Sequence, residues 1–206
     1  MDFWIRELLI SPDQFFSRNK LEAAGLFRPA MIIGCGSVLG IFSAIVLSVY
    51  GPFPDPYLML ADYPQEVLYY YILKPVLFPY IAWFCIAVIL YLVSSVFSTA
   101  GNFTAILNNS GYGCLPLTII TPVGTTGAII SYGYCDDPAQ IRNFLVFGLL
   151  FISLLFILWS GWIWTAAVRS IRGVSGFRAS VPSVFAVLAF ACSTLLYYSE
   201  IIRPVL

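Results

Sequence analysis

The residues that most often carry out chemistry in proteins are few in this chain of 206 residues. It has no histidine, which removes the commonest general base and the commonest metal ligand. Its five cysteines stand singly, without Cys-x-x-Cys spacing, so neither a zinc site nor a disulfide framework is predicted. A serine nucleophile would have no histidine to activate it and no lysine nearby. We therefore expect a protein that is not an enzyme and that uses no metal or other cofactor.

Charged side chains are equally scarce, and their placement excludes further classes of function. Lysine and arginine number ten, aspartate and glutamate also number ten, and together they make up 10% of the chain. Because these charges cancel, nucleic acid is not an expected partner. No charged residue lies between Lys74 and Asp136. Since intramembrane ionisable groups mark proton relays and ion pathways, their scarcity argues against a coupled transporter and against an intramembrane hydrolase.

The apolar stretches that remain predict how the chain is organised. A bilayer core takes about 20 residues of apolar helix, and five stretches approach or exceed that length. We predict an all-α fold: a polytopic membrane protein with a five-helix transmembrane bundle in residues 31–206 and an interfacial amphipathic helix in residues 1–30. The predicted spans are Met31–Tyr50, Pro75–Phe97, Tyr112–Tyr132, Phe144–Val168 and Val181–Tyr198.

The third span is unusual because two prolines interrupt its apolar sequence. The segment "TIITPVGTTG" has the threonine, valine and glycine of a potassium-filter loop, but not the pore helices or repeated copies that a filter needs. Pro116 and Pro122 are expected to break or kink this helix, which could expose backbone carbonyls to a cavity inside the bundle. A kinked helix that serves packing is the favoured interpretation.

The distribution of basic residues predicts the orientation of the chain in the cell membrane. If the N-terminus is cytoplasmic, the inner segments carry seven basic residues and the outer segments carry three. Basic residues favour the cytoplasmic side, so we predict a multi-pass protein with its N-terminus in the cytoplasm and its C-terminus outside it.

A surface helix is predicted ahead of the first span. The sequence Ser11-Pro12-Asp13-Gln14 is typical of a helix start. A helix from about Pro12 to Leu26 would turn Phe15 and Phe16 toward the acyl chains and keep charged side chains near the headgroups. A short helix packed on the inner ends of the spans is the alternative.

The uncharged loop between the second and third spans presents a similar choice. Phe103, Ile106 and Leu107 have the spacing of one helix face, so residues 102–108 could form one or two helical turns at the interface. A plain loop is equally compatible with this sequence.

Close helix packing is predicted for one face of the first span. Gly36, Gly40 and Ala44 recur every four residues, and small residues at this spacing let helix backbones approach closely. Packing within one chain is favoured over a dimer contact.

Four short motifs make the chain resemble a known family. "SPDQFF" stands ahead of the first span, "AGNFT" and "GYGCLPL" lead into the third, and Trp164 followed by "RSIRGVSGFRA" leads into the last. Together they resemble motifs of the Yip family, the Ypt/Rab-interacting type of integral membrane protein, through its prokaryotic relatives. The motif residues are Pro12, Phe16, Gly101, Phe103, Gly111, Tyr112 and Pro116.

This resemblance implies a non-enzymatic scaffold or adaptor that acts in membrane organisation or in trafficking-like processes. Its expected partners are membrane lipids, with partner membrane proteins or further copies of the chain as additional candidates. The alternative is a channel or carrier for a small or lipidic solute that uses the proline-containing third span. A continuous polar cavity at residues 116–127 would favour the channel, and a tightly packed bundle would favour the scaffold.

Overall fold

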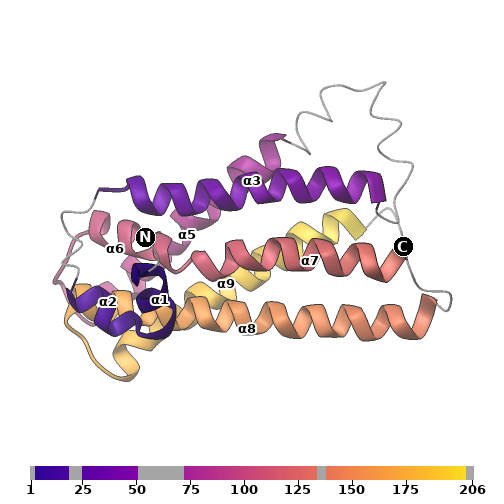
Figure 1. The fold of residues 1–206 in the computed structure, drawn as a ribbon. Helices are drawn as coiled ribbons and strands as arrows, with labels where there is room; N and C mark the ends of the chain where they lie inside the picture. Colours follow the sequence, from indigo (N-terminus) through magenta and orange to yellow (C-terminus); the bar gives the residue numbers. More distant parts are fainter. Residues whose placement is uncertain (1–2, 19–24, 51–71, 134–137, 203–206) are drawn as a thin grey trace.

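The computed structural model describes residues 3–18, 25–50, 72–133 and 138–202, and the regular elements in these ranges are all helices (Figure 1). The all-α fold class is therefore confirmed. The helices are α1 (Phe3–Ile10), α2 (Pro12–Arg18), α3 (Phe27–Tyr50), α5 (Lys74–Ser95), α6 (Phe103–Tyr112), α7 (Leu115–Gly133), α8 (Pro138–Arg172) and α9 (Phe177–Ile202).

The five longest of these helices form a closed ring. Each contacts its two neighbours in the order α3, α7, α8, α9, α5 and back to α3. They alternate in direction along the chain, so α1 and the C-terminal end of α9 lie at opposite ends of the bundle (Figure 1). Each predicted span falls largely on one of these helices.

Length and hydropathy identify the parts of these helices that could cross a membrane. Two stretches are both long enough and apolar enough, Lys74–Ser95 in α5 and Phe151–Arg172 in α8. Two shorter apolar stretches, Phe27–Ser43 and Phe177–Cys192, belong to α3 and α9. The chain thus supplies apolar helices that are compatible with a bilayer.

Helix α7 differs from the prediction for the third span. It begins at Leu115, so Pro116 lies in its first turn, where the missing backbone N–H would have no intrahelical partner. It then continues through Pro122 to Gly133. Of the two outcomes expected for these prolines, the break is therefore wrong, because one proline occupies a tolerated position and the helix continues past the other, while the favoured kink stays a prediction.

The N-terminal helices also differ from the prediction. Phe15 and Phe16 are only 2% and 3% exposed, so the expectation that they face acyl chains is wrong. They pack inward because Ile163 of α8 and the neighbouring Tyr112 offer an apolar surface within the molecule. The alternative, a short helix packed on the ends of the long helices, describes α2.

Helix α6 is a real helix, but it does not lie on the surface. Asn102 caps it, since its Oδ1 accepts a hydrogen bond from the backbone N–H of Ala105 at 2.8 Å. Ile106 is 1% exposed, and the helix contacts α3, α5 and α8. Because α3 and α8 are not neighbours in the ring, α6 bridges the ring at one end.

Candidate functional site

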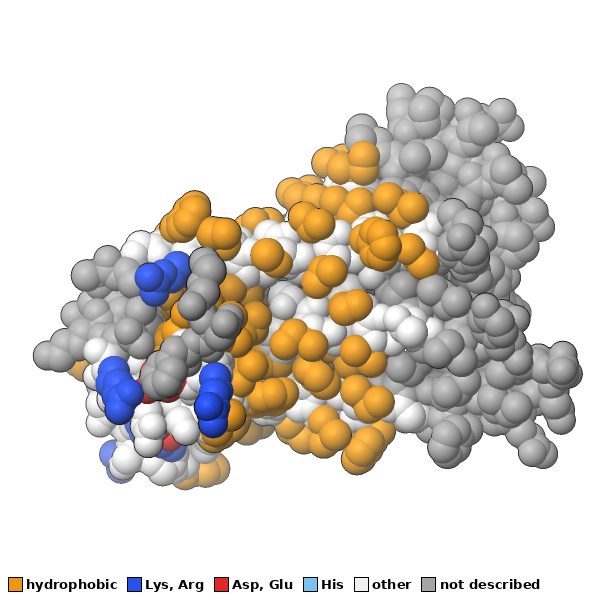
Figure 2. All heavy atoms as spheres, viewed as in Figure 1, with side chains coloured by type: hydrophobic (Ala, Val, Ile, Leu, Met, Phe, Trp, Pro, Cys, Tyr) orange, Lys and Arg blue, Asp and Glu red, His pale blue; other side chains and the backbone are white. Residues whose placement is uncertain are grey.

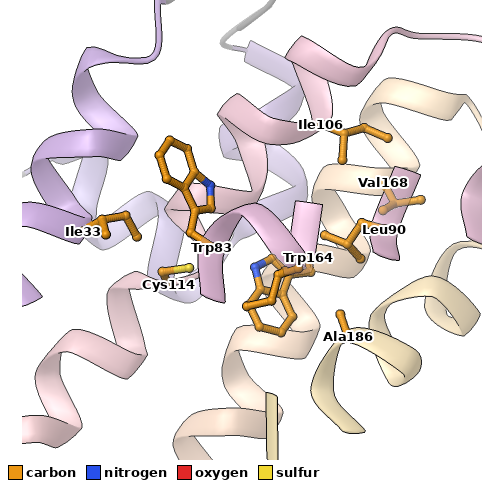
Figure 3. Close-up of a cluster of buried hydrophobic side chains, with 9 residues drawn as sticks. Ile33, Trp83, Leu90, Ile106, Cys114, Trp164, Val168 and Ala186 are labelled. Carbon is orange, nitrogen blue, oxygen red and sulfur yellow. The ribbon is translucent and has the colours of Figure 1, made fainter. Parts of the chain in front are cut away.

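Two tryptophan side chains hold the C-terminal end of α6 (Figure 3). The Trp83 indole of α5 donates from Nε1 to the carbonyl oxygen of Leu107 at 3.0 Å and to Oγ of Ser110 at 3.1 Å. The Trp164 indole of α8 donates from Nε1 to the carbonyl oxygen of Ser110 at 2.9 Å. The carbonyl oxygen of Ser110 also accepts from the backbone N–H of Gly113 at 3.1 Å, and that of Leu107 accepts from Oγ of Ser110 at 2.9 Å. Trp83 and Trp164 add side-chain donors to these acceptors, and we call the pair the tryptophan clamp.

Two glycines make the close approach of the clamp possible. A Cβ atom at Gly113 would lie 2.2 Å from Cδ1 and Nε1 of Trp164. A Cβ atom at Gly111 would lie 2.4 Å from Cβ of Pro29 and 3.1 Å from Nε1 of Trp83. Real Cβ atoms do not tolerate such distances, so any larger residue at these two positions must displace an indole ring or the start of α3.

Tyr112, between these glycines, anchors an aromatic cluster that we define as Tyr112, Trp4, Phe15 and Phe16. The ring centroids of Trp4, Phe15 and Phe16 lie 6.3, 5.4 and 6.3 Å from that of Tyr112, with edge-to-face geometry. Burial raises the pKa of the Tyr112 hydroxyl, and the positive charge of Arg28 partly opposes that rise. The cluster joins α1 and α2 to the end of α6.

Arg172 is the buried cation at this end of the bundle, with an exposed fraction of 3%. Its Nε donates to Oγ of Ser94 at 2.9 Å, and its Nη2 donates to the carbonyl oxygen of Tyr91 at 3.2 Å. Its Nη1 donates to the carbonyl oxygens of Ala100 and Gly101 at 2.6 and 3.3 Å. The guanidinium also lies over the Tyr91 ring, 4.8 Å from its centroid. Each of these acceptors is uncharged. Because they belong to α5 and to the backbone between α5 and α6, Arg172 joins the end of α8 to that part of the chain.

Gly101 and Phe103 are positioned by the same connection. Gly101 has a φ of +75°, and a Cβ atom there would lie 2.4 Å from Cγ2 of Ile171. Phe103 packs edge-to-face against Phe84 and Tyr91, with ring centroids 5.9 and 5.6 Å away. Both residues therefore fix the start of α6 against α5 and α8.

The small residues of the first span lie at helix contacts. A Cβ atom at Gly36 would lie 2.8 Å from Cγ2 of Thr118 in α7, and one at Gly40 would lie 3.5 Å from Cβ of Pro75 in α5. The side chain of Ala44 lies outside the described residues. The two glycines thus face different neighbours, and Gly36 allows the closer approach.

The contacts of this site hold helices together. In the ranges that the structure describes, no three side chains of His, Cys, Asp or Glu are grouped so that they could hold a metal ion. The buried hydroxyls of Ser37 and Ser160 donate to carbonyl oxygens one turn earlier, those of Ile33 and Phe156. Cys114 is buried among the apolar side chains around the clamp. The site is built from indole and guanidinium groups that donate hydrogen bonds to backbone carbonyl oxygens.

Sequence reasoning missed Trp83 and Arg172 as members of this site. A signal for Arg172 was available, because Trp164, Val168 and Arg172 recur every four residues and therefore share one face of a helix. All three are buried, whereas Arg169 and Ser170 are exposed. The position of Trp83 carried no comparable signal, because both faces of its span are apolar.

On the face shown in Figure 2, the described charged side chains lie on the surface around the tryptophan clamp. Figure 2 shows basic side chains gathered at the end formed by α1, α2 and α6, while hydrophobic side chains extend along the long helices. Two ion pairs hold the N-terminal helices, Arg18 to Glu7 at 3.1 Å and Arg169 to Asp13 at 2.8 Å. In addition, Nε1 of Trp159 donates to the carbonyl oxygen of Leu9 at 3.0 Å.

Comparisons with known proteins agree with the motifs. The family model of the Yip1 domain matches residues 6–197, which is nearly the whole chain. An uncharacterized protein from Methanocaldococcus jannaschii is 29% identical over 112 residues, which cover 53% of this chain and 77% of the relative. No solved structure matches.

Proposed function

The chain belongs to the Yip1 domain family, and from this premise we propose that it is a multi-pass membrane scaffold rather than a channel. The five long helices would cross the bilayer, and the end that carries α1, α2 and α6 would face the cytoplasm. There the scaffold would bind partner proteins and take part in membrane organisation.

One observation carries the membrane placement. Large apolar side chains are exposed along each of four long helices whose side chains are described there, while the charged side chains of this face gather at one end (Figure 2). Water would make such an exposed surface unfavourable, but hydrocarbon would not. Examples with at least half of their surface exposed are Val38 and Phe42 in α3, Leu77, Ile81 and Phe84 in α5, Phe151, Leu154 and Leu158 in α8, and Val184, Phe185 and Leu188 in α9.

The packing at the charged end supports a scaffold over a channel. Helix α6 bridges the ring there, and the close contacts of Gly111 and Gly113 with the tryptophan clamp fill the space beside it. The channel alternative relied on a proline-broken third span, whereas α7 continues through Pro122. A bundle that α6 closes at one end suits a scaffold, whose role is to offer its surface to partner proteins.

The proposed orientation rests on the exposed basic residues at the α6 end of the bundle. Arg6, Arg18, Arg28, Arg169 and Arg178 are all exposed and belong to α1, α2, α3, α8 and α9. The positive-inside rule places such residues on the cytoplasmic side.

Thiol labelling of intact cells tests this orientation. One variant keeps only Cys135, whose surroundings lie outside the described residues, and the other carries only Ser175→Cys in the exposed turn after α8. We expect a membrane-impermeant reagent to label Cys135 in intact cells and the residue-175 thiol only after permeabilisation. A third variant that keeps only Cys192, which belongs to α9, should stay unlabelled in both conditions. The opposite pattern for the first two sites would overturn the orientation.

Reconstitution separates a scaffold from a channel. The chain is purified in mild detergent, its co-purifying proteins and lipids are identified, and solute flux is then measured in vesicles. We expect flux equal to that of empty vesicles, and partners that are lost when Gln14 and Ser17 on the exposed face of α2 are replaced by arginine. Solute flux that Gly113→Leu abolishes would support the channel instead.

A further inference from the structure

Helices α3 and α9 begin with the same pair of exposed residues, a phenylalanine followed by an arginine. Phe27 and Phe177 are 74% and 80% exposed, more than any other phenylalanine whose burial is described. Arg28 and Arg178 are exposed as well. Both helices contact α5, one on each side of it in the ring. The chain therefore presents the same combination of an aromatic ring and a cation twice at its charged end.

Each phenylalanine continues the exposed apolar stripe of its own helix. In α3, exposed apolar residues follow Phe27 at positions +4, +11 and +15, and in α9 they follow Phe177 at positions +7 and +11. These spacings keep side chains on one face of an α-helix. The two rings therefore point in the direction that the lateral surface of the bundle already presents to hydrocarbon. The residues of the stripes are Met31, Val38 and Phe42, and Val184 and Leu188.

Arg28 and Arg178 differ from two of the other exposed arginines of this end, and share with Arg6 the lack of an ion pair to any described residue. Arg18 and Arg169 form ion pairs with Glu7 and Asp13. Arg28 and Arg178 form no ion pair with any residue that the structure describes. The Arg28 guanidinium interacts with the uncharged hydroxyl of Tyr112, which occupies only part of its hydrogen-bonding capacity. Both guanidinium groups can therefore bind an anion that comes from outside the chain, and arginine is well suited to bidentate binding of phosphate.

We infer that each of these pairs, Phe27 with Arg28 and Phe177 with Arg178, binds an anionic phospholipid of the cytoplasmic leaflet. The ring lies among the acyl chains, and the neighbouring guanidinium binds the lipid phosphate. The inference rests on the proposed function, because it requires α3 and α9 to cross the membrane with this end at the cytoplasmic leaflet. The membrane anchor then lies in the first turns of α3 and α9, and not in α2 as the sequence suggested.

Lipid retention by the full-length chain tests this inference. The chain is purified in mild detergent with phosphatidylglycerol and phosphatidylcholine at equal concentrations, and retained lipids are counted by native mass spectrometry. We expect the wild type to retain up to two phosphatidylglycerol molecules preferentially. Removing each arginine should reduce this preference about fivefold, the effect of one basic residue near an anionic membrane surface.

A matched pair of double variants separates a local site from the effect of net charge. R28Q/R178Q and R18Q/R169Q remove the same charge, and only the first should lose the preference for phosphatidylglycerol. The single variant R178Q provides a second measurement, because Arg28 also acts on Tyr112 and its loss could affect folding. Equal losses in both double variants, or unchanged retention in R28Q/R178Q and R178Q, would overturn the inference.

Two further measurements locate the cause of a negative result. F27S/F177S keeps both arginines and should weaken retention of both lipids by a similar factor, since the rings contact acyl chains in either case. Unchanged retention of both lipids would contradict the role of the rings. Extraction of cell membranes with alkaline carbonate tests the premise separately, because a chain released by carbonate refutes the membrane placement itself. A chain that stays in the membrane without lipid preference refutes only the lipid sites.

Discussion

Two short helical regions lie at the same end of the bundle and are held in opposite ways. Helix α6 has no charged residue, and buried indole and guanidinium donors bind its ends and the backbone before it. The N-terminal region, α1 and α2, buries the aromatic rings of Phe15 and Phe16 but keeps its charged residues in exposed ion pairs. The first region contacts α3, α5 and α8, whereas the second contacts α8 and, through its aromatic rings, the end of α6.

The difference explains the unusual composition of the α6 segment. Where surrounding helices exclude water, every polar group needs a partner inside the protein, so asparagine, serine and glycine serve better than charged residues. Where water remains in contact, charged residues are tolerated and add little stability. We therefore expect substitutions around α6 to be costly and substitutions in the exposed ion pairs of α2 to be mild.

The largest effect should come from Arg172→Leu. The substitution leaves the carbonyl oxygens of Tyr91, Ala100 and Gly101 without the donors that Arg172 provides. We expect the free energy of unfolding, measured with denaturant in mild detergent, to fall by about 3–5 kcal/mol. Arg169→Leu serves as the control and should cost far less, because the side chain of its partner Asp13 is 50% exposed to water. Equal costs would remove the contrast between the two regions.

Gly113→Ala should be the next most severe change. Its added methyl group would lie 2.2 Å from the Trp164 indole, so the ring must move and its hydrogen bond to Ser110 weakens. We expect a loss of about 2–3 kcal/mol in the same unfolding assay. Gly148→Ala is the matched control, because nothing lies within 4 Å of a Cβ atom there, and it should be neutral or slightly stabilising.

The glycines of α3 test whether such intolerance follows the distance to the neighbouring helix. Gly36→Ala should cost about 1 kcal/mol, because its methyl group would lie 2.8 Å from Thr118, while Gly40→Ala should cost almost nothing at 3.5 Å from Pro75. Gly40→Leu, whose side chain reaches further, should cost about 1–3 kcal/mol. If Gly40→Ala is the more harmful of the two alanine variants, distance to the neighbour does not set the tolerance.

The smallest effect should come from the ion pair between Asp13 and Arg169. Its side chains are 50% and 42% exposed, so a double-mutant cycle with Asp13→Asn and Arg169→Gln should give a coupling of less than about 1 kcal/mol. Raising the salt concentration should reduce it further. A coupling of several kcal/mol that resists salt would make α2 as tightly held as α6.

The sequence was sufficient to predict the long helices and insufficient to predict how the short ones pack. Runs of about 20 apolar residues are a local property, so α3, α5, α8 and α9 follow from composition. The inward direction of Phe15 and Phe16 depends on Tyr112 and Ile163, which are distant in sequence. The glycines Gly111 and Gly113 were visible as a motif, but the indole rings that require them come from α5 and α8. The proline at position 122 carried no information on whether the helix would continue.

The contact between Arg172 and the backbone before α6 has a consequence for biosynthesis. The ribosome synthesises residues 91–101 between 71 and 81 residues before it reaches Arg172, and Ser110 54 residues before Trp164. Until α8 has been inserted, α6 therefore lacks the Trp164 donor at its C-terminal end, and the backbone before it lacks the Arg172 donors. A nascent chain that stops after α7 should be a substrate for membrane quality control, and folding of this end of the protein should follow insertion of its fourth long helix.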